Sequence, residues 1–173
     1  GDPNAPVVIE EFSDFGCSHC ARFSETTSID LAKSYVESGD VYFIFRSVGG
    51  LLGSPISPII SEAAYCAGDQ NEFWRFHDLV FANQGLLYGT SNIDIDGYMI
   101  DFAETLNLDM DEFESCYNGR EYREQVAQDE LDARRVGVTG TPSFLVNDQL
   151  IQGNQNFSVF EEIIQEELTT NSQ

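Results

Sequence analysis

The feature that most constrains this chain is a pair of cysteines two residues apart, in the stretch DFGCSHCARF. Cys17 and Cys20 follow directly after the apolar run VVIEEF, whose β-branched and aromatic residues predict a buried strand. We expect a helix to begin at the cysteines and to continue to about Val36, where Gly39 ends it. Such a CxxC spacing occurs in metal sites, in structural disulfides and in redox-active dithiols.

A metal site needs two more ligands at a comparable spacing. The other candidates are His19, His77, Cys66 and Cys116, and the sequence contains no second CxxC and no HxxxH. We therefore disfavour zinc or an iron–sulfur cluster, and we expect neither a metal nor another cofactor.

The surroundings of the motif favour a redox dithiol. Cys17 stands at the expected N-terminus of a helix, where unpaired backbone N–H groups and the helix dipole stabilise a thiolate. Cys20 lies one turn further in, so it can close the disulfide while being less exposed. A protonated His19 would add positive charge beside Cys17 and make the disulfide more oxidising. The alternative for His19 is a solvated helix residue.

Two acids, Glu10 and Glu11, lie on the strand before the motif. Alternation places them on opposite faces of the sheet. Glu11 lies six residues before Cys17, and one of the two acids is therefore our candidate for a carboxyl beneath the dithiol that relays the proton of Cys20. A surface acid is the alternative in a chain so rich in acids.

The rest of the chain predicts a mixed architecture. A second strand is expected at residues 41–46, which gives a right-handed βαβ unit with a parallel strand pair. Five helices follow, which indicates a helical insertion. A hairpin turning at Asn147-Asp148 and a final helix close the chain. The expected caps are Ser57 (before Pro58), Asn71, and a capping box of Ser158 and Glu161. Aspartates lead the two short helices expected after the one that starts at Asn71.

The stretch GVTGTPSFLV places Pro142 just before a strand, where a proline belongs at the first residue or in a turn. A Gly-Thr-Pro turn is compatible with a cis peptide, which is rare enough to imply a specific purpose. An ordinary trans-proline turn stays open as the alternative.

Charge limits the partners. The chain carries 30 acidic residues against 8 basic ones, a net charge of −22. This disfavours nucleic acid and anionic membranes as direct partners. It fits a highly solvated surface and also a high-salt habitat.

Because the sequence starts at Gly1 without methionine, we interpret it as a mature or trimmed form, in which a signal peptide or anchor is not seen.

Three separated stretches, VVIEEFSDFGCSHC, EAAYCAGDQNEFWRFHDLVFANQ and ARRVGVTGTPSFLVND, together resemble the DsbA-like disulfide oxidoreductases of the thioredoxin superfamily. The resemblance implies an exposed nucleophile at Cys17, a resolving Cys20, thiolate support from His19 and a buried acid at Glu11. It also implies a substrate groove lined by Thr141 and a cis Pro142, with Ser18 in the dipeptide between the cysteines. The departures are Ser18, where strongly oxidising members usually carry proline, and Thr141, which isomerases also carry.

The resemblance implies an α/β fold: a thioredoxin-like fold with a helical insertion between its βαβ and ββα halves. We expect one domain over residues 1–173, with the core at about 5–50 and 121–170 and the insertion at about 55–120. Some members carry a second, structural disulfide here, which favours a Cys66–Cys116 bond; two unpaired core thiols are the alternative.

We therefore expect a thiol:disulfide oxidoreductase that acts on reduced or unfolded proteins, most readily as an oxidase in the periplasm or another extracytoplasmic space. A membrane quinone-linked partner would reoxidise it. A reductase or isomerase, and a thioredoxin-fold binding module with structural cysteines, are the alternatives.

Overall fold

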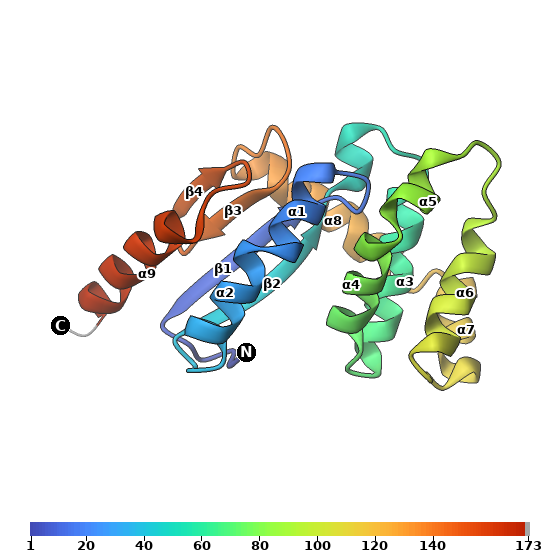
Figure 1. Ribbon diagram of the computed structural model, residues 1–173, viewed down its shortest axis with the longest axis horizontal. Helices are drawn as coiled ribbons and strands as arrows, with labels where there is room; N and C mark the ends of the chain where they lie inside the picture. The colour runs from blue at the N-terminus through green and yellow to red at the C-terminus, as the bar shows by residue number, and fades with distance from the viewer. Residues whose placement is uncertain (172–173) are drawn as a thin grey trace. The chain divides into compact units, whose positions relative to one another are not determined.

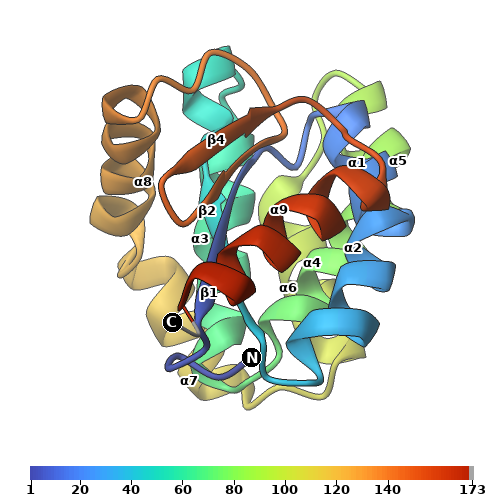
Figure 2. The same cartoon turned by 90° about the vertical axis from the view of Figure 1, so that its left-hand side faces the viewer.

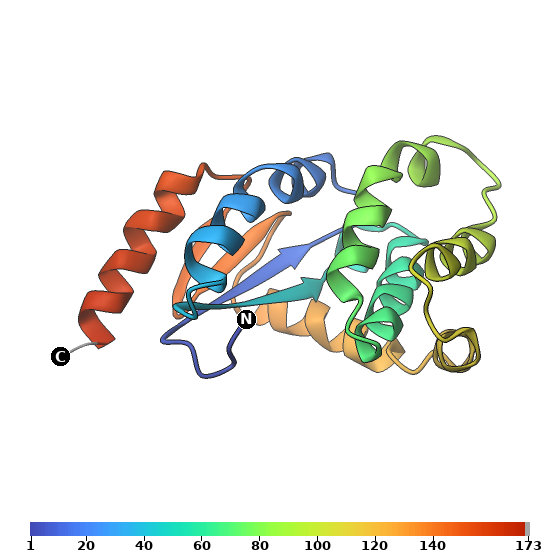
Figure 3. The same ribbon diagram turned by 60° about the horizontal axis from the view of Figure 1, so that its bottom comes forward.

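The strand before the two neighbouring cysteines is β1, Val7–Ser13, in the computed structural model, which describes residues 1–171. It lies inside a four-stranded sheet of order β2-β1-β3-β4, with β2 at Val41–Ser47, β3 at Ser143–Val146 and β4 at Gln149–Gln152. β1 and β2 run in the same direction (Figure 3), and β3 pairs antiparallel with both β1 and β4. The predicted parallel pair and C-terminal hairpin are confirmed, and Asn147 takes a positive φ of 50° at the hairpin turn.

Three helical segments follow the motif where the sequence predicts one helix. These are α1 (Ser18–Glu25), α2 (Thr27–Leu31) and a π-helical turn, η1 (Ala32–Val36). The single-helix prediction is wrong at Thr26, whose φ of −129° and ψ of −90° interrupt the helix. The Thr26 hydroxyl donates to the carbonyl of Arg22 at 2.7 Å, a side-chain bond that bends helices.

Aromatic rings fill the core between the sheet and its helices. Phe23 of α1 lies 4.5 Å from Phe144 of β3 between ring centroids and 5.8 Å from Phe160 of α9 (Phe157–Asn171). Figure 2 shows α2 and α9 side by side over the sheet. The predicted inward face of the last helix is confirmed, because Phe160 and Ile164 are fully buried. These packed residues hold β1 and α1, and hence both cysteines, in fixed positions.

The chain divides into two compact units. The first contains Gly1–Ser13, Cys17–Arg46 and the described residues from Ala133 onward, and the second contains Asp14–Gly16 and Ser47–Asp132. The predicted single domain with a helical insertion at about 55–120 stays a prediction. No described helix is both long enough and apolar enough to span a membrane.

The second unit is helical (Figure 1). Asp94 and Asp109, aspartates at the start of two helices expected from the sequence, cap them by accepting from the backbone N–H groups of Gly97 and Glu112. Its elements are a short 3₁₀ turn η2 (Gly49–Leu52), α3 (Ser57–Asp69), α4 (Phe73–Ala82), α5 (Gln84–Gly89), α6 (Ile95–Thr105), α7 (Met110–Gly119) and most of α8 (Arg123–Arg135).

Several predicted helix starts are wrong. Ser57 lies inside α3, whose N-cap is Ile56, and the Ser57 hydroxyl pairs with that of Tyr88 at 2.8 Å. Asn71 has a φ of 63° and precedes α4, whose N-cap is Glu72. Ser158 lies inside α9, which begins one residue earlier, so it cannot form the predicted capping box. The short helix α5 was not predicted.

A disulfide joins α3 to α7. Cys66 and Cys116 are linked with an S–S distance of 2.00 Å, and the predicted pairing is therefore found. The bond closes a loop of 50 residues. In the loop-entropy account, such a closure restricts the unfolded chain by about 4 kcal/mol.

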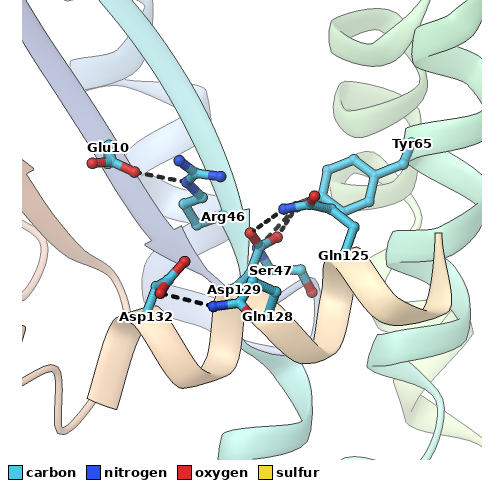
Figure 4. Close-up of polar contacts among 8 residues, drawn as sticks. All are labelled: Glu10, Arg46, Ser47, Tyr65, Gln125, Gln128, Asp129 and Asp132. Carbon is cyan, nitrogen blue, oxygen red and sulfur yellow. Dashed lines mark hydrogen bonds and ion pairs between the residues drawn. The ribbon is translucent and has the colours of Figure 1, made fainter. Parts of the chain in front are cut away.

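A buried carboxylate organises the polar interior of the second unit (Figure 4). Asp129 of α8 is 0% exposed and accepts from the Tyr65 hydroxyl, from the Ser47 backbone N–H at 3.1 Å and from Gln125 Nε2 at 2.9 Å. Because a buried charge is costly without such donors, this cluster fixes the end of β2 against α3 and α8.

We predict that Asp129→Ala lowers the free energy of unfolding by about 3 kcal/mol, because buried donors lose their acceptor. Urea denaturation followed by circular dichroism measures the change. The control is Glu124→Ala, an exposed acid of the same helix, for which we expect about 0.5 kcal/mol or less. Equal effects of the two substitutions would show that the Asp129 cluster does not stabilise the unit.

Candidate active site at the CxxC motif

The two cysteines of the motif occupy opposite environments although one helical turn separates them. Cys17 is the N-cap of α1, with an extended backbone (φ −85°, ψ 120°), and is partly exposed. Cys20 lies inside α1 and is 0% exposed. Both are present as thiols. Ser18 and His19 between them are exposed. An accessible sulfur and a buried one therefore share the first turn of the helix.

The thiolate form of Cys17 is strongly favoured. The Cys20 thiol donates a hydrogen bond that lowers the pKa of Cys17 to about 5; burial opposes this shift, and Thr141 and the backbone N–H groups of Cys20 and His19 assist it. Backbone donors at a helix N-terminus are the expected source of such support. Near neutral pH, Cys17 is consequently an ionised nucleophile.

Cys20 behaves in the opposite way. Burial, the hydrogen bond to Cys17 and the charge of Glu11 all raise the pKa of the Cys20 thiol. The pair therefore holds one proton near neutral pH, and Cys20 keeps it. A proton that leaves this buried sulfur would need a nearby acceptor.

Glu11 is placed where it can be that acceptor. Its side chain is 2% exposed, and burial raises the pKa of its carboxyl to about 8, with the Ser13 hydroxyl opposing the rise and the charge of Cys17 adding to it. Glu10 faces away and pairs with Arg46 Nε at 2.7 Å (Figure 4). The alternation expected from the sequence thus separates a buried acid from a surface ion pair.

The loop before β3 meets the reactive cysteine. The Thr141–Pro142 peptide bond is cis, as the sequence allowed. Cys17 Sγ lies 3.4 Å from the carbonyl oxygen of Thr141. A cavity of about 300 Å³ opens beside this loop, lined by residues 139–143 together with Gln152 and Gly153. The structure thus brings Cys17 next to Thr141, which is 124 residues away in the sequence and directly precedes Pro142.

Not every predicted site residue has the expected contact. His19 supports the Cys17 thiolate through its backbone N–H, and the role of its exposed imidazole stays a prediction. Sequence reasoning missed Ser13, a fully buried serine two residues after Glu11. Strand alternation, which places Glu11 and Ser13 on one face, would have been the signal. In the described part of the chain, no cluster of three or more His, Cys, Asp or Glu side chains has a metal-binding arrangement.

Comparisons with known proteins agree with this geometry. A family model described as thioredoxin matches residues 1–166. The chain is 30% identical over 173 residues to the probable disulfide bond formation protein D of Bacillus anthracis, covering 97% of this chain and 76% of that protein. The crystal structure of oxidised BdbD from Bacillus subtilis superposes with a TM-score of 0.83 at 24% identity, covering 98% of this chain and 91% of that one.

A further relative is much longer than this chain. The Na(+)/H(+) antiporter NhaA 1 of Salinispora arenicola is 33% identical over 156 residues, which are 90% of this chain and 22% of the antiporter. The chain thus spans about a fifth of that protein's length.

We predict that Glu11→Gln stabilises the reduced protein increasingly as the pH rises from about 4.5 to about 8. A raised carboxyl pKa means that the folded wild type holds a proton that the unfolded chain releases, so wild-type stability falls over this window. The gain at pH 8 is on the order of 3 kcal/mol. Urea denaturation across this pH range measures it.

Glu10→Gln is the matched control, because it removes a neighbouring acid that faces away from the dithiol. We expect no comparable growth of stability with pH for this variant. A Glu11→Gln effect that is independent of pH would contradict the raised pKa.

Proposed function

We propose that this chain, which belongs to the DsbA-like proteins of the thioredoxin family, catalyses thiol–disulfide exchange between its Cys17–Cys20 pair and cysteines of other proteins. One observation carries the proposal: the accessible Cys17 has a pKa lowered to about 5, whereas the pKa of the buried Cys20 is raised. A cysteine pair with a purely structural role does not require different pKa values in its two thiols. Attack on a disulfide requires a thiolate, and the difference supplies one at Cys17 alone.

In the proposed oxidase cycle, a substrate thiolate attacks Cys17 Sγ of the oxidised protein. The Cys17–Cys20 bond breaks, and its electron pair leaves on Cys20, which takes up a proton. A second substrate thiolate then attacks the substrate sulfur of the mixed disulfide and expels Cys17 as a thiolate. The substrate has lost two electrons, and the dithiol holds them.

The direction of the exchange reaction depends on how strongly the protein stabilises the Cys17 thiolate. A protein that stabilises the Cys17 thiolate favours its own reduction and so oxidises its partners, and such potentials lie near −120 mV in DsbA against about −270 mV in thioredoxin. Ser18 and Thr141 differ from the pattern of strongly oxidising members, which keeps a reductase or isomerase as the second candidate. A binding module with structural cysteines is disfavoured by the ionised Cys17.

Reduced or unfolded proteins are the proposed substrates. Ser18, Thr141 and Pro142 would contact them, because these residues lie on the exposed turn of the motif or on the loop that meets Cys17. We also propose an extracytoplasmic location, where disulfides persist, and a membrane quinone-linked partner that removes the two electrons. His19 would add charge at Cys17 when protonated.

We predict that the oxidised protein introduces disulfides into a reduced, unfolded protein with several cysteines, when glutathione disulfide is the terminal oxidant. Cys17→Ser abolishes the activity because the nucleophile is lost, and Cys20→Ser accumulates a mixed disulfide at Cys17. Mass analysis of alkylated substrate measures both results.

The double variant Cys66→Ala/Cys116→Ala is the control, because it removes the other disulfide and leaves the motif intact. It should retain the exchange rate of the wild type when assayed below its melting temperature. A wild type that only reduces substrate disulfides would favour the reductase, and an unreactive Cys17 would favour the binding module.

A further inference from the structure

Unpaired buried polar atoms gather around the dithiol. Among the described residues, Glu11 Oε1, Ser13 Oγ and Thr141 Oγ1 are buried without a hydrogen-bond partner of standard geometry. Native proteins leave few such atoms, because each costs about 1–3 kcal/mol, so a cluster of them requires an explanation. Thr141 lies in the loop that meets Cys17. The other two residues, Glu11 and Ser13, lie on β1, the strand before the motif.

Ser13 lies on the same face of β1 as Glu11. It is the last residue of the strand and is 0% exposed, and strand alternation directs residues two apart to one side of the sheet. The Ser13 hydroxyl also lowers the pKa of both Glu11 and Cys20, in each case against the larger effect of burial. The Ser13 hydroxyl is therefore close enough to affect both groups, although it makes no hydrogen bond of standard geometry to either of them.

Water has no direct access to the Cys20 sulfur, which is 0% exposed. A proton that leaves or reaches this sulfur is therefore transferred inside the protein, and a side chain that faces the sulfur can carry it. A serine hydroxyl donates and accepts at the same oxygen, so it can take one proton while it gives up another.

We propose that the Ser13 hydroxyl passes the proton between Cys20 and Glu11. When Cys20 attacks a mixed disulfide at Cys17, its thiol proton moves to Ser13 Oγ, and the Ser13 proton moves to the Glu11 carboxylate. The Cys20 sulfur then bonds to Cys17 Sγ, and the outgoing thiolate carries the electron pair of the broken bond. In the opposite direction the same two protons move back. This inference rests on the proposed exchange activity.

The test uses the full, reduced protein and dithiobis(nitrobenzoate), an aromatic disulfide that releases a coloured thiolate. Cys17 attacks first and releases one equivalent, and the attack of Cys20 on the mixed disulfide then releases the second. Stopped-flow absorbance from pH 6 to 10 gives the rate of the second release. In the wild type this rate should rise with a midpoint near 8, where Glu11 becomes a carboxylate.

Ser13→Ala should slow the second release by roughly tenfold or more, a smaller loss than the roughly 10²–10⁴-fold of a complete positioned acid–base group, because Glu11 is still present. It should also remove the midpoint near pH 8, because the carboxylate no longer receives the proton. The first release should be unchanged. In a Glu11→Gln background, Ser13→Ala should cause no further loss, since the acceptor is already absent.

Ser47→Ala is the matched control, because it removes the hydroxyl of another fully buried serine at the end of the neighbouring strand. Its rate and pH profile should match the wild type. If Ser13→Ala does not fold, a comparison of Ser13→Thr with Ser13→Val replaces it. The two side chains have the same shape and differ in that threonine has a hydroxyl where valine has a methyl. The second release should be faster in the threonine variant by the factor expected between the wild type and Ser13→Ala.

A Ser13→Ala protein with the wild-type rate and midpoint would overturn the relay, as would a full additional loss in the Glu11→Gln background. A wild type that never releases the second equivalent would instead refute the exchange activity itself.

Discussion

Cys20 is buried one helical turn after Cys17, and the hydrogen bond that its thiol donates is the largest influence lowering the pKa of Cys17. The arrangement needs a helix that begins at the first cysteine and a sheet that covers the second. β1 and α1 supply both, and the rings around Phe23 fix α1 against the sheet. Stabilisation of one thiolate is therefore a property of the packed fold and not of the four-residue motif alone.

The same burial that protects Cys20 also creates a difficulty. A sulfur without access to water cannot exchange its proton directly with solvent, and Glu11 beneath it has a pKa raised to about 8. The buried carboxyl costs stability when it ionises. We propose that proton transfer with Cys20, through Ser13, is the reason that a destabilising residue occupies this position.

Local sequence signals predicted most of the fold. The β-branched run of β1 and the turn at Asn147 each depend on residues close in sequence, and each was found. The wrong expectations concern the caps at Ser57, Asn71 and Ser158 and the single helix that breaks at Thr26. The two serines lie just inside their helices.

For the site as well, features that depend on local sequence could be predicted, and features that depend on long-range contacts could not. The burial of Cys20 and Glu11 was foreseeable from the strand and helix that carry them, whereas the approach of Thr141 to Cys17 depends on contacts across 124 residues and needed the family resemblance. Ser13 was missed because a serine at the end of a strand carries no chemical signal until its burial is known.

The most direct test of this account compares the free energies of unfolding of the reduced and oxidised Cys17–Cys20 forms from pH 4 to 8, with Cys66–Cys116 kept intact. If the fold stabilises the Cys17 thiolate, the reduced form is the more stable at pH 7. Because the pKa of Cys17 is lowered, this advantage is largest at high pH and is lost as the pH falls through about 5. A more stable oxidised form at pH 7, or a difference that does not change with pH, would contradict the central claim.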